Sequence, residues 1–233
     1  MGLKEDLQEA VSKIIRERWT ERDGNVVPEP ADVQLGNDAV NLDATVLYAD
    51  LADSTKLVDS QTRTRAAEVY KAYMLCAAQI IKYHGGAITA YDGDRIMALF
   101  IGDSKNSSAA KVALKINWAL QEIVNPANKR VYGDLAYAVG HKIGIDTSSI
   151  LASRIGVRND NDIVWVGRAA NYAAKLCTIR EEGYSIYISR AVFERLNDDS
   201  KYGGNPRRLM WEARSWTAMN DMSIYRSNWW WGL

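Results

Sequence analysis

The sequence predicts an α/β (α+β) fold of the ferredoxin-like type, with the element order βαββαβ. Short apolar, β-prone runs alternate with longer helical patterns along most of the chain. The dipeptide Asp92-Gly93 lies between two such runs and is typical of a tight β-hairpin. With 233 residues, 47% hydrophobic and 25% charged, the chain is long and apolar enough to bury a core.

The first 41 residues are predicted to be an amphipathic helix and a linker, followed by a main domain over residues 42–233. Residues 3–19 place apolar side chains at helical spacing, namely Leu3, Leu7, Val11, Ile14 and Ile15, with Trp19 near the end. Residues 21–41 are polar and contain proline, which is typical of irregular structure. The apolar stripe of this helix is expected to pack either on its own domain or on a partner subunit.

The main domain is predicted to open with a strand at residues 44–49. A long helix over 62–83 follows and stops at His84-Gly85-Gly86, because glycine commonly ends helices. Strands at 87–91 and 95–101 flank the hairpin turn, and a second helix is expected over 107–124.

The second half of the chain should add a long strand over 135–150, interrupted around residues 146–148, and a short strand at 163–166. A helix from 168 to about 179, a strand at 184–189 and one or two strands within 209–226 complete the prediction. In this order the first strand and the hairpin lie side by side in one sheet.

Composition narrows the function classes. Lys+Arg and Asp+Glu both number 29, so the formal net charge is 29 − 29 = 0, without the basic excess of a nucleic-acid binder. Two cysteines, Cys76 and Cys177, are too few for a disulfide framework or a zinc cluster and indicate buried thiols in a reducing cytosol. No segment approaches the apolar length of a membrane span, and the charged N-terminus is unlike a signal peptide. A cytoplasmic protein without membrane partners is therefore expected.

Two aspartates are the leading candidates for chemistry. Asp50 ends the first strand and Asp94 follows the hairpin tip, so adjacent strands would bring both carboxylates to one point. Two carboxylates repel each other unless a hard divalent cation lies between them, and the main-chain carbonyl of Leu51 could add a ligand.

The residues after the first aspartate suit a phosphate. The run Asp53-Ser54-Thr55 precedes a helix, where amides and hydroxyls could cradle an anion. The alternative is that Asp50 merely caps a helix and that Asp92 to Asp94 form a solvated turn, and generic spacing alone favours this alternative.

Four segments in register resemble the class III nucleotidyl cyclases, the family of adenylate and guanylate cyclases. They are residues 45–55 with Asp50, residues 85–94 with Asp94, residues 143–147 with 152–156, and residues 167–176. The last segment, Gly-Arg-Ala-Ala-Asn-Tyr-Ala-Ala-Lys-Leu, resembles the family's Asn-x-Ala-x-Arg helix. The resemblance spans about residues 44–226.

The resemblance implies a catalytic domain that uses two Mg²⁺ or Mn²⁺ ions per active site to cyclise a nucleoside triphosphate. It also implies a head-to-tail homodimer in which Asp50 and Asp94 of one subunit face Asn171 and Lys175 of the other. Asn171 would orient the ribose. Lys175 replaces the family's transition-state arginine and keeps its charge but not its planar fork, so Arg168 or Arg154 could assist.

The base-recognition positions depart from the purine cyclases. They hold Ala90 and Val164, neither of which can hydrogen-bond a purine edge through its side chain. Tyr48 occupies a position where the family often has phenylalanine beside the base. This combination resembles the pyrimidine cyclases of bacterial Pycsar anti-phage systems, above all the uridylate-making members. It implies UTP as the substrate and cyclic UMP as a messenger for a separate effector.

Several alternatives stay open on the sequence. The chain could be a cytidylate or adenylate cyclase of the same fold, or an inactive nucleotide-binding regulatory domain. A diguanylate cyclase is disfavoured because the hairpin tip reads Tyr-Asp-Gly-Asp. His84 and His141 are expected to be structural, and Trp229 to Trp231 to plug an apolar groove or form a partner surface.

Overall fold

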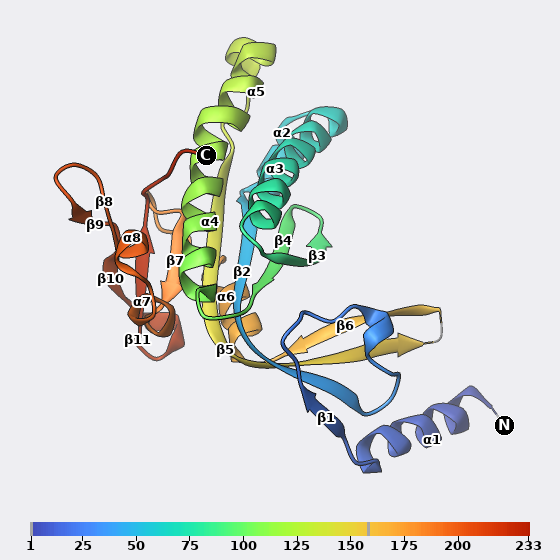
Figure 1. Cartoon of the computed structure of the whole chain (residues 1–233). Helices are drawn as coiled ribbons and strands as arrows, with labels where there is room; N and C mark the ends of the chain where they lie inside the picture. Colours follow the sequence, from blue (N-terminus) through green and yellow to red (C-terminus); the bar gives the residue numbers. More distant parts are fainter. Residues whose placement is uncertain (1, 158) are drawn as a thin grey trace.

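A computed structural model describes residues 2–157 and 159–233, and within them a single nine-stranded sheet forms the centre of the molecule (Figure 1). The strands run in the order β10-β11-β7-β5-β2-β4-β3, with β1 paired to β2 and β6 paired to β5. Their bounds are β1 (Thr20–Asp23), β2 (Asp38–Ala52), β3 (Ala87–Asp92), β4 (Arg95–Phe100), β5 (Gly140–Val157), β6 (Asp160–Val166), β7 (Ile186–Ser189), β10 (Glu212–Trp216) and β11 (Met222–Ser227). The inner order β5-β2-β4-β3 confirms the ferredoxin-like prediction.

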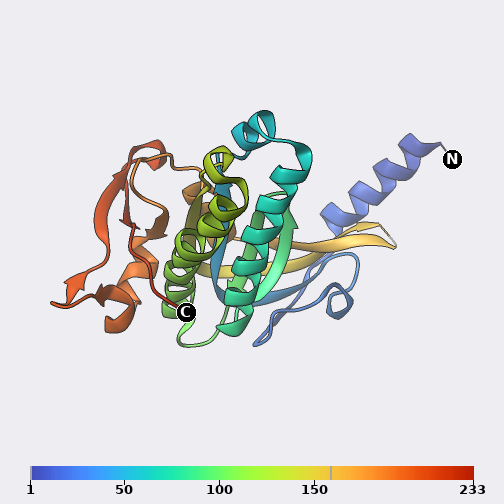
Figure 2. The ribbon, with the colours of Figure 1, turned by 90° about the horizontal axis from the view of Figure 1, so that it is seen from above.

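Helices α3 (Arg63–Tyr83) and α4 (Lys105–Ala119) lie side by side over one face of the sheet (Figures 1 and 2). Alternate residues of β2, namely Leu47, Ala49 and Leu51, point into this main core and are at most 2% exposed. The Thr62 side chain caps α3 by accepting a hydrogen bond from the Arg65 amide. A π-helical turn (Leu120–Val124) and α5 (Asn125–Tyr132) extend α4 past the expected end at residue 124.

Helix α6 (Arg168–Leu176) covers the opposite face of the sheet. Its alanines Ala169, Ala170 and Ala173 pack in a second core with Val46 of β2. The approach to β5 is so close that a Cβ atom at Gly144 would lie 2.1 Å from the carbonyl oxygen of Ala173. Glycine is therefore required at position 144 for α6 to lie directly on the sheet.

The stretch 21–41 is irregular only in part, which corrects the prediction. It contributes β1, which pairs in parallel with the start of β2, and a 3-10 turn (Pro30–Asp32). Arg22 donates a 2.6 Å hydrogen bond to Asp38, which fastens this segment to β2. Every residue of β1 is exposed, so this strand carries no hydrophobic alternation that could reveal it. Strand β2 also runs continuously through residues 41 and 42, where the boundary between the linker and the main domain was expected.

Helix α1 (Leu3–Arg16) buries none of its own residues, all of which are described. It adjoins the far end of an arm, which we define as residues 38–44 and 149–157 together with β1 and β6 (Figure 1). The Asn37 side-chain amide holds its last turn by donating to the carbonyl oxygens of Ile14 and Glu17, both at 2.8 Å. Of the two expected locations for its apolar stripe, packing on its own domain is not observed.

Strand β5 runs for 18 residues without the interruption that was expected around residues 146–148. Thr147 finds a partner inside the molecule, since its hydroxyl lies 3.0 Å from the hydroxyl of Thr45. Polar side chains in a strand resemble a turn in the sequence, but here the Thr147 hydroxyl is hydrogen-bonded in the core. Segments 143–147 and 152–156 therefore both belong to the one strand β5.

The C-terminal region adds small elements before and between the last strands. They are α7 (Arg190–Glu194), α8 (Asp198–Lys201), β8 (Tyr202–Gly203), β9 (Arg208–Leu209) and a 3-10 turn (Thr217–Met219). Trp229 and Trp231 pack against the main core, while Trp230 is 49% exposed, so the three indoles do not share one environment. Cys76 and Cys177 are free thiols; Cys177 is buried, as expected, whereas Cys76 is only half-buried. Across the described residues, no helix combines the length and apolar character needed to cross a membrane.

Candidate active site

Asp50 and Asp94 meet at one end of the sheet. Asp50 lies opposite Arg95 in the β2–β4 ladder, and the Leu51 amide donates to the Asp94 carbonyl oxygen at 3.3 Å. A tight turn at Asp53, whose φ is +56°, starts helix α2 (Ser54–Ser60) directly after the strand. Both aspartates, Leu51 and the run 53–55 therefore border one cavity of about 630 Å³.

The cavity combines both signs of charge with hydroxyl groups. Its polar lining is Asp50, Asp53, Ser54, Thr55, Lys56, Asp59, Ser60, Asp94, Arg95 and Arg180. These residues comprise four carboxylates and three cations. Because the carboxylates outnumber the cations, a triphosphate would need additional positive charge to enter.

Asp50 is the buried carboxylate of the cavity, at 6% exposure. Burial raises its pKa, and the Asp94 charge raises it further, while Arg95 and Arg180 oppose the shift. The Arg95 Nε lies 3.5 Å from one carboxylate oxygen and the Arg180 Nη2 lies 4.0 Å from the other. Both distances exceed a good N–H···O hydrogen bond, so the Asp50 oxygens keep the capacity to bind another cation.

The donor set fits a hard divalent cation only in part. Within residues 2–157 and 159–233, no three His, Cys, Asp or Glu side chains converge as a metal cluster. Two carboxylates and a main-chain carbonyl are nevertheless the oxygen donors that Mg²⁺ or Mn²⁺ prefers, and Mg²⁺ is commonly completed by substrate phosphates. Asp50, Asp94 and Leu51 thus fit a metal that arrives with its substrate.

Tyr48 lies one row further into the sheet from Asp50. Register places Tyr48 opposite Met97 of β4, and Met97 opposite Ala90 of β3, so the three share a row across neighbouring strands. The Arg95 guanidinium lies 5.9 Å from the Tyr48 ring centroid. Burial raises the pKa of the Tyr48 hydroxyl, so it stays protonated and can donate a hydrogen bond at neutral pH.

The structure does not bring every predicted site residue to this cavity. Asn171 and Lys175 are exposed on α6 and do not line it, and the Lys175 Nζ lies 3.9 Å from the Met219 sulfur. Val164 is half-buried on β6 of the arm, opposite Ser153 and outside the Tyr48 row. A single chain therefore holds two separate halves of the predicted site.

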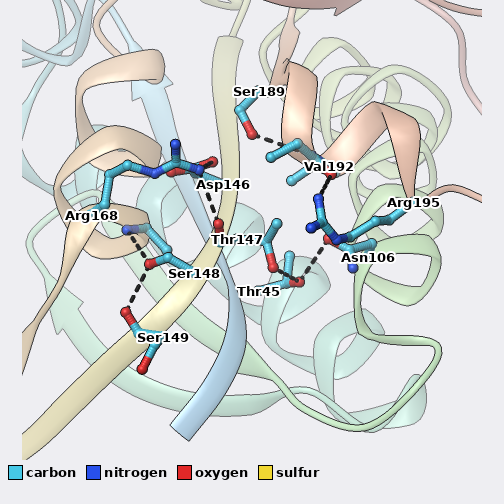
Figure 3. A network of polar contacts seen from close by, with 12 residues as sticks. Thr45, Asn106, Asp146, Thr147, Ser148, Ser149, Arg168, Ser189, Val192 and Arg195 are labelled. Atoms are coloured by element: carbon cyan, nitrogen blue, oxygen red, sulfur yellow. Dashed lines mark hydrogen bonds and ion pairs between the residues drawn. The ribbon is translucent and has the colours of Figure 1, made fainter.

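Arg168 points back into its own chain rather than toward the cavity. Its Nη2 donates to the buried Asp146 carboxylate and to the Thr147 carbonyl oxygen, both at 3.1 Å (Figure 3). Arg154, the other candidate for assistance, donates a 2.7 Å hydrogen bond to Asn161 in the arm.

Arg180 is the cavity residue that the sequence reasoning missed. It follows α6 in the loop that leads to β7, and β7 runs parallel to β5. Since β5 runs antiparallel to β2, the loop before β7 returns to the edge of the sheet where β2 ends. This topology is the signal that could have placed Arg180 beside Asp50.

No family model matches the sequence. The chain is 46% identical to a uridylate cyclase of Xanthomonas perforans and 44% identical to one of Burkholderia cepacia, covering 99% or more of both chains in each case. A uridylate cyclase of Rhodovulum is 34% identical over 99% of this chain and 98% of its own.

Solved structures share the fold. The adenylyl cyclase CyaB of P. aeruginosa superimposes with a TM-score of 0.68 at 18% identity, over 81% of this chain and 95% of CyaB. A bacterial light-regulated adenylyl cyclase gives a TM-score of 0.68 at 16% identity, over 82% of this chain and 52% of its own.

Proposed function

The chain belongs to the uridylate cyclases, within the class III nucleotidyl cyclase family, and we propose that it converts UTP into 3′,5′-cyclic UMP and pyrophosphate. The observation that carries this proposal is the cavity shared by Asp50 and Asp94, with Tyr48 and Ala90 in the adjoining row. Asp50 and Asp94 suit a metal-bound triphosphate. Tyr48 and Ala90 leave a base pocket without the side chains that hydrogen-bond a purine.

The pocket row supports a pyrimidine. Ala90 offers only a methyl group, and Val164 has no polar atom, so neither can hydrogen-bond a purine edge. Tyr48 is bulkier, and the Arg95 guanidinium lies 5.9 Å from the centroid of its ring, so both occupy space at the Tyr48 end of this row. A smaller base that accepts hydrogen bonds from a phenol or a guanidinium fits this row, and uracil has two carbonyl oxygens for that purpose.

The reaction places different demands on the two halves of the site. When bound, Mg²⁺ or Mn²⁺ would lower the pKa of the ribose 3′-hydroxyl and neutralise negative charge on the triphosphate. Asp50, Asp94 and the Leu51 carbonyl would hold the ions, while the hydroxyls of Ser54 and Thr55 would donate to phosphate oxygens.

The second half of the site would orient the ribose and stabilise the transition state. Asn171 would hold the ribose for in-line attack on the α-phosphorus, and Lys175 would stabilise the charge that develops there. Neither residue needs to act as a nucleophile.

A head-to-tail homodimer would unite the halves. Asn171 and Lys175 are exposed on α6 and lie outside the cavity of their own chain, so the α6 of a second subunit would complete it. The exposed apolar side chains of α1, with Leu3 at 76% and Ile15 at 77%, further support a second subunit.

The product would be a diffusible messenger in the cytoplasm that activates a separate effector in anti-phage defence. Among the described residues there is no membrane-spanning helix, and the net charge of zero does not favour nucleic acid. Phage infection of bacteria that carry this chain and its effector tests this role. Plaque counts should fall when the chain is wild type and should not fall when it is catalytically inactive.

The direct test is to incubate the protein with UTP, CTP, ATP and GTP separately, with Mn²⁺ or Mg²⁺, and to identify the products by mass spectrometry. Cyclic UMP should be the main product. Cyclic CMP or cyclic AMP as the main product would overturn the base assignment while leaving a cyclase. No cyclic nucleotide from any substrate would favour a binding or regulatory domain.

Replacing Tyr48 by phenylalanine should lower kcat/KM for UTP by about tenfold, because a buried hydrogen bond to the base would be lost. The Tyr48 side chain is only half-buried, so the change should spare folding. Tyr70→Phe, on α3 and away from the cavity, is the matched control. An unchanged preference for UTP over CTP and ATP would show that the hydroxyl does not read the base.

A further inference from the structure

A buried carboxylate, Asp146, lies beneath the first turn of α6. It is fully buried in the middle of β5. It points to the α6 face of the sheet, as does Gly144 two residues earlier. Its Oδ1 accepts a 3.1 Å hydrogen bond from Arg168, the first residue of α6 (Figure 3).

The start of α6 is attached to β5 at several points around this pair. Arg168 also donates to the Thr147 carbonyl oxygen at 3.1 Å, and the Ala169 amide donates to the Ser148 hydroxyl at 3.0 Å. A Cβ atom at Gly167 would lie 2.7 Å from the Ile150 side chain, so the backbone runs directly over the strand. These contacts fix where the helix begins and how it is rotated about its axis.

Burying this carboxylate is costly. Burial raises the pKa of Asp146, and only Arg168, Ser189 and the Thr147 backbone oppose the shift. An apolar residue would serve the core of β5 without that cost. The Asp146 carboxylate therefore serves a purpose other than packing, and its charged partner is Arg168.

Arg168 lies on the same stripe of α6 as the residues assigned to the substrate. Asn171 and Lys175 follow it by three and seven positions, which places all three on one side of a helix. A rotation or slide of the first turn would displace both residues together. A misplacement of about 1 Å can lower a rate about a hundredfold, so the attachment of this turn bears on the chemistry.

We propose that Asp146, acting through Arg168, is a positioning residue that sets the rotation and start of α6, and thereby places Asn171 and Lys175 at the substrate held by the partner subunit. The inference rests on the proposed cyclase function. It assigns Arg168 an anchoring role in place of the substrate contact expected from the sequence.

The first test compares Asp146→Asn, Arg168→Gln and the double variant. Each single change should lower kcat by about ten- to a hundredfold and shift KM for UTP by less than about threefold. The double variant should lose no more than the worse single one, since both changes break the same pair. Asp43→Asn, an exposed aspartate on β2, is the control. Full activity of either single variant, or additive losses, would overturn the proposal.

The second test separates positioning from general damage by mixing subunits. In a dimer of Asp146→Asn with Asp50→Asn, one site combines intact metal aspartates with an intact α6. Equal mixing should restore about a quarter of wild-type activity, because half of the dimers carry one such site. Asp146→Asn mixed with Lys175→Ala should restore nothing, because both chains lack a competent α6.

Lys175→Ala mixed with Asp50→Asn provides the reference. If this reference pair recovers and Asp146→Asn with Asp50→Asn does not, the inference fails and the proposed function stands. If the wild-type chain makes no cyclic nucleotide, the proposed function itself fails. Should Asp146→Asn not fold, Arg168→Gln, at a half-exposed side chain, takes its place in every mixture.

Discussion

Replacing Asp50 by asparagine is expected to lower kcat at least about a thousandfold, since losing one metal ligand removes several kcal/mol of transition-state stabilisation. Asp50 is the buried member of the pair, with Arg95 and Arg180 beside it. Asparagine keeps the shape of the side chain but not the charge that a divalent cation needs. Asp94→Asn should act in the same direction, because both carboxylates border the same cavity.

Folding should not suffer from this change. The pKa of Asp50 is raised in the folded protein, chiefly by burial, so the ionised form is disfavoured relative to the unfolded chain. Such a group stabilises the fold at pH values below its unfolded pKa, and this contribution is lost as the pH rises through the folded pKa. At neutral pH without metal, Asp50→Asn should therefore melt no lower than the wild type.

The same shift predicts the acid limb of activity. In the metal-free enzyme, protonation of Asp50 competes with metal binding, so kcat/KM at limiting Mn²⁺ should fall as the pH is lowered, beginning above the range of an ordinary aspartate. Profiles of kcat/KM against pH, with Asp43→Asn as the matched control on β2, check this effect, and thermal melting of Asp50→Asn checks the effect on folding. Residual activity within about tenfold of wild type would remove Asp50 from the metal site.

The fold could be predicted where local patterns and tertiary packing agree. The hairpin at Asp92-Gly93, the long helix after Thr62 and the buried first strand all emerged as expected. Strand β1 could not be predicted because it is exposed along its length and is stabilised by the edge of β2. The unbroken β5 could not be predicted because Thr147 looks like a turn residue until its partner Thr45 is known.

Some residues of the candidate site could likewise be predicted from the sequence, and others could not. Asp50 and Asp94 follow from the strand order, and the structure places both at one cavity. Arg180 depends on a crossover to β7 that no local pattern reveals. The role of Asp146 depends on a helix packing on a strand with glycine at the contact, which requires coordinates rather than spacing.

Replacing Lys175 by methionine is expected to lower kcat about a hundredfold to a thousandfold, the usual cost of losing one transition-state donor, with little change in KM for UTP. The Lys175 Nζ lies 3.9 Å from the Met219 sulfur, and the side chain is exposed. The ammonium group is therefore available to a substrate on another subunit. Methionine keeps the length and apolar stem of the side chain, so α6 should stay in place.

An arginine at position 175 should keep activity within about tenfold of wild type, because it restores a cation and adds a planar fork for phosphate oxygens. The comparison of methionine with arginine thus isolates charge from packing, and Lys71→Met on the exposed side of α3 is the matched control. If Lys175→Met stayed within about threefold of wild type, the transition-state cation would have to come from elsewhere. Arg180, already 4.0 Å from Asp50, would then be the first residue to replace.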